Sequence, residues 1–234
     1  MSMFFRDVIG QSEAKQHLLT LKREGRIPHA MLFCGMEGTG KLPLAIAFAR
    51  YLCCENPGPD DACGHCPSCI KMNKLVHPDI HFAFPVIKKK SNKDAVSDDF
   101  IDAWRQLLLD TPYFSLPTWL ARMGAENQQA QIFVRESDEI TRKLSLKSSQ
   151  GGYKIMIIWL PEKMNAECGN KLLKLLEEPP AQTLFLWITE NPDMILPTLQ
   201  SRLQRFNLPP LSEKDLSDLL QTRYMLQPDD AADI

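Results

Sequence analysis

A glycine-rich segment near the amino terminus constrains the fold more than any other part of this chain. The stretch LFCGMEGTGKLPLAIAFAR, residues 32–50, joins a short apolar run to a helix-like apolar pattern through several glycines. It matches the phosphate-binding loop G-x-x-x-x-G-K-[ST] at every position except the last, which is Leu42. Because such a loop joins a buried parallel strand to a helix, the sequence predicts an α/β domain.

The same loop raises a chemical question. In a working loop the final hydroxyl ligates Mg²⁺, and Leu42 has no oxygen, so we expect no Mg²⁺ site. Backbone N–H groups at a helix N-terminus attract phosphate without a metal, whereas the glycines could also be kept only for the turn. Nucleotide binding is therefore expected to be weak or absent, and its candidate residues are Gly35, Gly38, Thr39, Gly40 and Lys41.

Apolar runs and helical patterns alternate along the rest of the chain. Strands are expected at 29–35, 77–87, 153–160 and 183–189, and helices at 11–23, 43–51, 166–178 and over most of 98–145, with breaks near Pro112 and Pro117. This alternation predicts a mostly parallel sheet flanked by helices. The texture changes at residue 208, where a proline-rich linker precedes a helix with Ser212 as its N-cap. We therefore expect a P-loop domain over 1–207 and the start of a second, helical domain over 208–234, apparently truncated.

Four of the seven cysteines have the spacing of a metal site. They follow the pattern Cys54-x8-Cys63-x2-Cys66-x2-Cys69, in a segment whose prolines and glycines favour tight turns. The spacing predicts a structural Zn²⁺ module at 54–69. An iron–sulfur cluster and a metal-free redox site are the alternatives, and spacing alone does not decide between Cys53 and Cys54.

Composition excludes several classes of protein. The sequence has 44% hydrophobic residues and a net charge of −2, without an apolar run of membrane-spanning length or a signal peptide. We expect a cytoplasmic protein that touches nucleic acid through a local patch or through partners. The lysine-rich stretch KKKSNKD, residues 88–94, is expected to be a solvated loop, with phosphate contact as the alternative.

Several motifs, in their order, resemble one family. The segments DVIGQSEAKQHL, HAMLFCGMEGTGK, KLLKLLEEPP and LFLWITENPDMILPTLQSR, with the cysteine motif between them, are similar to the delta-prime subunits of the bacterial DNA polymerase III clamp loader, relatives of the AAA+ ATPases. The resemblance covers nearly the whole chain and is weakest at 86–131, whose role it does not explain. It implies an AAA+ P-loop sheet flanked by helices, with an inserted zinc knuckle and the start of a small helical domain.

The resemblance also implies that the ATPase site is degenerate. In active relatives the strand matching KIMIIWL ends in Asp-Glu, which hold the metal and orient the attacking water, and here these positions are Trp159 and Leu160. With Leu42, three polar groups needed for hydrolysis are replaced by apolar ones. Glu162, two residues further on, is expected to be an ordinary surface carboxylate.

An arginine is the remaining candidate for a catalytic role. Clamp-loader subunits carry a Ser-Arg-Cys motif whose arginine points at the ATP of a neighbouring subunit, and the matching residues are Ser201, Arg202 and Leu203. Arginine suits this role because its planar charged fork pairs with several phosphate oxygens. A surface salt bridge is the alternative for Arg202, and without the motif Arg205 would be an equal candidate.

The expected function is that of a non-hydrolysing clamp-loader subunit, a component of a DNA-directed DNA polymerase holoenzyme. Its implied partners are the other loader subunits in a hetero-oligomeric ring and, through the complex, the sliding clamp and primer-template DNA. The first alternative is a self-sufficient P-loop ATPase with an unusual metal site. The second is a zinc knuckle that reads single strands, which its acidic flank and lack of aromatic residues disfavour.

Overall fold

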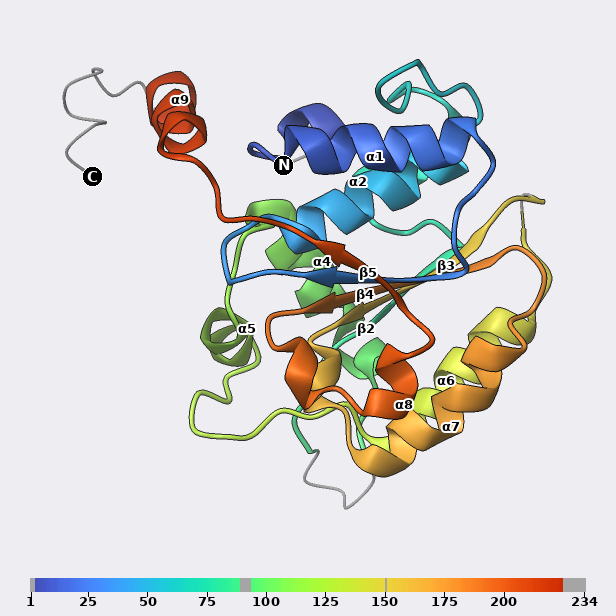
Figure 1. The fold of residues 1–234 in the computed structure, drawn as a ribbon. Coiled ribbons are helices and arrows are strands. Elements are labelled where there is room, and N and C mark those ends of the chain that lie inside the picture. Colours follow the sequence, from blue (N-terminus) through green and yellow to red (C-terminus); the bar gives the residue numbers. More distant parts are fainter. Residues whose placement is uncertain (1–2, 89–93, 150, 225–234) are drawn as a thin grey trace.

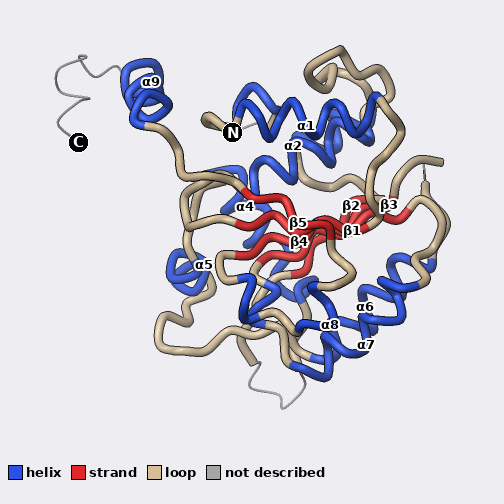
Figure 2. Tube along the Cα trace, viewed as in Figure 1, coloured by secondary structure: helices blue, strands red, loops and turns tan. Residues whose placement is uncertain are grey.

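The computed structural model describes residues 3–88, 94–149 and 151–224. In these residues one sheet of five parallel strands forms the centre, in the order β2-β3-β4-β1-β5 (Figures 1 and 2). The strands are β1 Ala30–Cys34, β2 Ile80–Ala83, β3 Lys154–Trp159, β4 Thr183–Thr189 and β5 Gln204–Asn207. The predicted parallel α/β fold is confirmed.

Helices cover both faces of this sheet (Figure 1). The helices α1, α2 and α4 pack on one face, and α6, α7 and α8 pack on the other. Their bounds are α1 Ser12–Arg23, α2 Lys41–Cys53, α3 Pro67–Asn73, α4 Ile101–Asp110, α5 Leu116–Arg122, α6 Val134–Ser145, α7 Ala166–Glu177, α8 Pro197–Gln200 and α9 Glu213–Tyr224. Successive residues of β3 alternate between the two cores, as the pleat of a strand requires.

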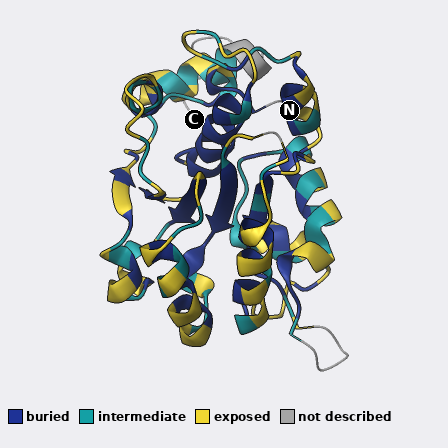
Figure 3. Cartoon of the chain, turned by 90° about the vertical axis from the view of Figure 1, so that its right-hand side faces the viewer, coloured by how far each residue is buried: buried dark blue, intermediate teal, exposed yellow. Residues whose placement is uncertain are grey.

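Burial explains which strands the sequence revealed. Every residue of β1, β3 and β4 is buried, because central parallel strands are covered on both faces, and these strands were predicted (Figure 3). The edge strand β2 is shorter than the expected 77–87. The other edge strand, β5, was not predicted, since Phe206 is its only buried residue.

The helix α2 connects the two sites of interest. All its residues except Cys53 are buried, including its charged residues Lys41 and Arg50. Its amino end continues from the glycine-rich loop, and its carboxyl end is capped by Cys54. Pro43 lies in the first turn, where its missing N–H leaves no helical hydrogen bond unmade.

The segment between β2 and β3 is helical in three pieces. A 3-10 turn at Ser97–Phe100 leads into α4, and α5 and α6 follow. Pro112 lies in a break, as predicted, but Pro117 does not break a helix. It lies in the first turn of α5, whose N-cap Ser115 accepts a hydrogen bond from the backbone N–H of Thr118. Most of the lysine-rich stretch 88–94 lies outside the described residues.

The chain leaves the sheet through a short linker into α9 (Figure 1). Ser212 is its N-cap, as predicted, because its hydroxyl accepts a hydrogen bond from Asp215 N at 3.1 Å. The division at residue 208 stays a prediction, since residues 225–234 lie outside the described part. Within that part, no helix combines the length and apolarity needed to cross a bilayer.

Candidate functional site: a filled phosphate loop and a four-cysteine centre

Backbone geometry accounts for the glycines of the phosphate-binding loop. Gly38 and Gly40 have φ values of 82° and 83°, in the left-handed region that side chains disfavour. At Gly35 an added Cβ would lie 2.8 Å from the carbonyl oxygen of Leu208, so only glycine fits there. These glycines are therefore needed for the strand-to-helix turn whether or not a phosphate binds.

The lysine of the loop is engaged by the loop itself. The Lys41 side chain is only 5% exposed, and its Nζ donates a hydrogen bond to the carbonyl oxygen of Met36 at 2.5 Å. The hydroxyl of Thr39 donates to the same carbonyl at 2.9 Å. Burial lowers the pKa of Lys41, and the charge of Glu190 opposes this shift most strongly. Both polar side chains thus have partners within the loop.

Residues 112–114, here called the plug, fill the space above the loop. The cavity that the loop lines with the plug, Trp159 and Glu190 measures only about 30 Å³. A cavity of this size has room for one or two water molecules, far less than a triphosphate needs. Tyr113 lies closest, since an added Cβ at Gly40 would be 3.2 Å from its Oη. This Oη also accepts a hydrogen bond from Ile9 N at 2.9 Å, which ties the plug to the amino-terminal loop.

The three apolar replacements lie around this filled space. Leu42 and Trp159 line the cavity beside the plug, and Leu160 is buried next to them. The Trp159 ring packs against Phe114 and Trp104, with centroid distances of 5.2 and 5.1 Å. No oxygen reaches the space from these positions, because their side chains are hydrocarbon or indole.

Glu162 differs from the expectation of an ordinary surface carboxylate. It is half-buried and accepts hydrogen bonds from Thr189 Oγ1 at 2.9 Å, Glu190 N at 3.0 Å and Asn191 N at 3.3 Å. These donors stand at the carboxyl end of β4. Glu162 therefore joins the turn after β3 to the end of β4 and is already saturated by the chain's own donors.

Arg202 lies at the surface beside the end of α7. Its Nε donates to Glu177 Oε1 at 3.0 Å, its Nη2 pairs with the same oxygen, and its Nη1 donates to Thr198 O at 2.6 Å. The salt bridge that was the alternative for Arg202 is therefore present. Leu203 is buried, so the residue that departs from the family motif packs inward. Arg205 lies on the edge strand β5 and donates to the side chain of Asn207.

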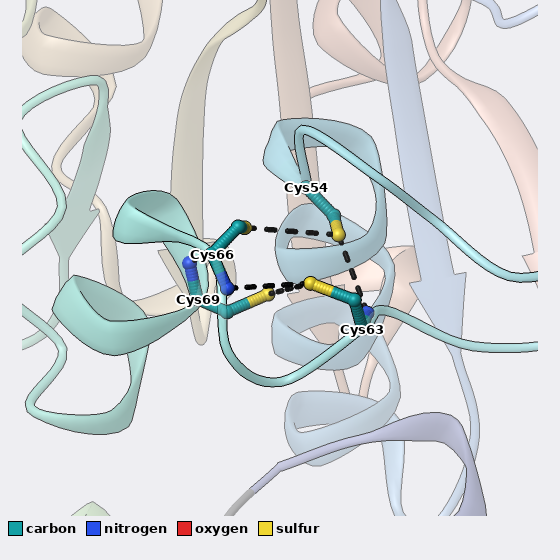
Figure 4. A group of neighbouring side chains, drawn as sticks. All are labelled: Cys54, Cys63, Cys66 and Cys69. Carbon is teal, nitrogen blue, oxygen red and sulfur yellow. Dashed lines mark hydrogen bonds between the residues drawn. The ribbon is translucent and has the colours of Figure 1, made fainter.

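The four predicted cysteines meet at the carboxyl end of α2 (Figure 4). Cys54 caps α2, Cys63 lies in the following loop, and Cys66 and Cys69 belong to the N-cap and first turn of α3. Their four Sγ atoms all lie within 4.8 Å of one another. The Cys54–Cys66 and Cys63–Cys69 sulfur distances are 3.9 and 4.0 Å. One tetrahedral Zn²⁺ with bonds of about 2.3 Å separates its sulfurs by about 3.8 Å, so the arrangement fits a single ion.

Backbone amides orient these sulfurs. The N–H groups of Cys63, Cys66 and Cys69 donate to the sulfurs of Cys54, Cys63 and Cys66 at 3.3, 3.4 and 3.4 Å (Figure 4). The hydrogen bond from the His65 amide is the main cause that lowers the pKa of Cys63 to about 6. Burial raises the pKa of Cys54 and of Cys69. The four groups can all be thiolates only if a cation compensates them.

Cys53 is not part of this group. It faces the main core, and burial raises its pKa to about 12, whereas Cys54 contributes to the cluster. Cys53 is the last residue of α2, whereas Cys54 is its C-cap with extended backbone, so the two side chains leave the helix end in different directions. The structure thus resolves the choice that spacing left open.

Sequence reasoning missed two features of these sites. The plug carries no motif, and its only signals were Pro112 and the aromatic residues around it. Glu177 stands in the segment KLLKLLEEPP, 25 positions before Arg202, and nothing in the sequence pairs the two.

Comparison with known proteins identifies the family. The model of the family described as "DNA polymerase III, delta subunit" matches residues 10–212. This chain belongs to that DNA polymerase III delta subunit family. The resemblance to delta-prime subunits is also confirmed, because the delta-prime subunit of Escherichia coli is 29% identical over 199 residues, which are 85% of this chain and 48% of the relative. That of Bacillus subtilis is 29% identical over 197 residues, 83% of this chain and 46% of the relative.

More distant matches fit the same picture. The gamma/tau subunit of DNA polymerase III from Mycobacterium bovis is 27% identical to this delta-family chain over 91% of its length, and 30% of the relative is covered. A solved RuvB variant from Thermotoga maritima superimposes with a TM-score of 0.53 at 15% identity, covering 98% of this chain and 57% of that one. This likeness shows the AAA+ fold alone. The chain spans about half the length of the delta-prime relatives it matches.

Proposed function

We propose that this delta-family chain is a non-hydrolysing subunit of a bacterial DNA polymerase III clamp loader in the cytoplasm. In this role it supports ATP-dependent loading of the sliding clamp onto primed DNA. The single observation that carries the non-hydrolysing part is the filled phosphate loop. The plug leaves a cavity of only about 30 Å³ beside the loop, and the metal-ligand positions Leu42, Trp159 and Leu160 are apolar. Metal-assisted phosphoryl transfer uses oxygen ligands at these positions and needs room for the triphosphate, so the apolar side chains and the small cavity both support a loop that does not hydrolyse ATP.

The chain's own contribution to ATP turnover would come from Arg202 in trans. Its guanidinium is partly exposed and already arranged by Glu177 and Thr198, so little side-chain entropy is lost when a phosphate approaches. A neighbouring subunit's triphosphate would compete with the Glu177 carboxylate for the same N–H donors. The partners in this proposal are other loader subunits in a ring, with the clamp and the primer-template reached through the complex.

The four-cysteine centre is proposed to hold one structural Zn²⁺. Four thiolates close its coordination sphere, which is typical of structural rather than catalytic zinc. A four-iron cluster places each thiolate on a different iron, and the close sulfur spacing disfavours that alternative. Elemental analysis should find about one zinc per chain. An X-ray absorption edge of iron, or no stoichiometric metal, would contradict the assignment.

Calorimetric titration and a turnover assay test the proposal at the phosphate loop. The purified chain should neither bind Mg·ATP with a dissociation constant below about 1 mM nor hydrolyse it, and Lys41→Ala should change neither result. Steady turnover that disappears in Lys41→Ala, in a preparation freed of contaminating ATPases, would support the self-sufficient ATPase instead.

A further inference from the structure

A buried arginine near the cysteine centre forms no ion pair with any of the described residues. Arg50, in the last turn of α2, is 1% exposed. Its Nη1 donates to Asn73 Oδ1 at 2.7 Å, but its Nε and Nη2 are buried without a hydrogen-bond partner among the described residues. A buried guanidinium is costly unless a negative group compensates it. No salt bridge joins Arg50 to a carboxylate in the part of the chain that the structure describes.

The residues around Arg50 connect it to the four-cysteine centre. Its guanidinium carbon lies 4.2 Å from the centre of the Phe4 ring, and Phe4 packs in one small cluster with Cys54, Cys66 and Cys69. Its hydrogen-bond partner Asn73 ends α3, the helix that carries Cys66 and Cys69. Burial lowers the pKa of Arg50, and this shift is opposed first by Cys69 and then by the carboxylates of Asp61 and Asp7.

We propose that Arg50 is the counter-charge of the metal centre. Four thiolates around one divalent ion carry a net charge of −2. The buried guanidinium places a positive charge against the Phe4 ring, which packs in one cluster with the cysteines. This inference rests on the proposed structural metal and goes beyond it. It assigns to α2 an electrostatic link to the centre in addition to the ligand Cys54 at its end.

The link has a consequence for folding. Metal binding holds four thiolates together near Arg50, and loss of the metal removes this fixed negative charge from the surroundings of the buried guanidinium. Metal binding should therefore stabilise the chain both by closing the ligand sphere and by compensating Arg50. An apolar residue at position 50 removes the second contribution and leaves the ligands intact.

Arg50→Met tests the inference, with Arg50→Lys as a second variant and Arg6→Met as a matched control. Arg6 contacts the same Phe4 ring at 4.1 Å, but its side chain is exposed at the surface. Zinc affinity of the whole chain is measured by competition with a chromophoric chelator, and thermal unfolding is followed with and without zinc. Arg50→Met should weaken zinc binding about 10- to 100-fold, as loss of an outer-shell partner does, and Arg6→Met less than about 3-fold.

The stability readout separates an electrostatic role from simple packing. Metal-free Arg50→Met should unfold at the same temperature as the metal-free wild type or higher, so its zinc-dependent shift is smaller. If Arg50→Met does not fold, Arg50→Lys decides, because it keeps the charge but not the planar fork and should weaken binding by less than 10-fold.

Two outcomes overturn the inference in different ways. Zinc affinity and a zinc-dependent shift equal to wild type in Arg50→Met would exclude Arg50 as the counter-charge while leaving the metal centre in place. Where Arg50→Met is unfolded, a loss of 10-fold or more in Arg50→Lys would do the same, because that variant keeps the charge. Absence of stoichiometric metal from the wild type would contradict the proposed metal centre itself, and with it the role proposed for Arg50.

Discussion

The two ends of α2 carry two sites that differ in how many of the side chains expected of each motif are present. At the amino end the backbone of a phosphate loop is intact, but its lysine bonds to the loop and its space is filled by residues 112–114. At the carboxyl end the ligand set is complete, with four sulfurs within 4.8 Å of one another. The loop has the backbone of the motif with the apolar Leu42, Trp159 and Leu160 around it, whereas the cysteine centre has all four of its predicted sulfurs in place.

The difference shows which motif residues report on chemistry. Gly35 and Gly40 would be required by the turn and by close contacts in any chain of this fold, so their presence says little about nucleotide. At the cysteine end three sulfurs accept backbone N–H hydrogen bonds, but Ser, Asn or Asp provides such acceptors in ordinary turns and caps, so these bonds alone do not require four converging thiols. A ligand set is therefore a stronger functional signal than a glycine pattern.

The largest expected effect is at the cysteine end. Cys69→Ser should abolish stoichiometric metal and lower the free energy of unfolding by more than about 4 kcal/mol, since a lost structural metal is among the most severe single changes. Thermal unfolding and elemental analysis measure it. Cys53→Ser is the matched control, adjacent to a ligand but outside the cluster, and should retain the metal. Equal losses in both variants would mean that packing, not ligation, holds this end.

The second prediction asks whether the chain acts on ATP through a neighbour rather than through its own loop. In the assembled loader, Arg202→Ala should slow turnover at one interface by roughly 10³-fold, as expected for a finger supplied in trans, and leave assembly intact. Arg202→Lys should rescue poorly because a point charge lacks the planar fork. DNA-stimulated ATPase and clamp loading are the measurements.

Two controls belong to the same experiment. Arg205→Ala should have a smaller effect, because Arg205 lies on the edge strand and outside the motif, and Lys41→Ala should have almost none. Clamp loading by Arg202→Ala at the wild-type rate would exclude the trans role.

The third prediction concerns a variant that removes part of the plug beside the phosphate loop, at the amino end of α2. Tyr113→Ala should cost about 2 kcal/mol of unfolding free energy, because its ring packs on the loop and its hydroxyl accepts from Ile9 N. It should also permit weak ADP binding at millimolar concentration without any turnover, since Leu42, Trp159 and Leu160 still supply no metal ligand. Equilibrium dialysis with ADP measures this. If Tyr113→Ala binds no more nucleotide than the wild type, the plug is not what closes the site.

The smallest expected effect is at Glu136 in α6, away from both ends of α2. It serves as a reference for the stability of the whole fold. Burial raises the pKa of Glu136 from 4.5 to about 7, and its Oε2 accepts from Ser97 N at 2.6 Å. The folded state therefore binds the proton more tightly than the unfolded state. Below pH 4.5 Glu136 is protonated in both states and does not destabilise the fold. Between pH 4.5 and about 7 its ionisation lowers the free energy of unfolding progressively, and above pH 7 the loss is complete.

Glu136→Gln should accordingly raise the free energy of unfolding by about 1 kcal/mol or more at pH 8 and by almost nothing at pH 4. Urea unfolding at the two pH values checks this. A gain of equal size at both would show that the effect is packing and not proton binding.

Central elements could be predicted from the sequence, because burial on both faces leaves uninterrupted apolar runs such as KIMIIWL. The edge strand β5 could not, since QRFN contains one buried residue and its pairing with β1 depends on the rest of the sheet. Pro117 was misjudged because a proline in a first turn and a proline in a break look alike without the N-cap geometry.

The sites divide in the same way. Cysteine spacing and the loop motif predicted which residues come together, because both are local in sequence. The contacts of the plug, the pairing of Arg202 with Glu177 and the contact of Arg50 with Asn73 join residues 23 or more positions apart. Nothing in a single sequence indicates such contacts when no motif marks them.

Under the proposed non-hydrolysing role, the backbone at Leu160 limits any attempt to engineer ATPase activity into this chain. Its backbone has φ 53° and ψ 58°, while its N–H still bonds to Ile188 O at 2.9 Å, so the main chain turns sharply directly after β3. A glutamate placed at this position would inherit that turn, and its carboxylate would start from a backbone direction unlike that of a regular strand end. Exchanging three side chains is therefore insufficient as a design. The turn at Pro161–Lys163 would have to be rebuilt as well, together with the contacts that Glu162 makes to β4.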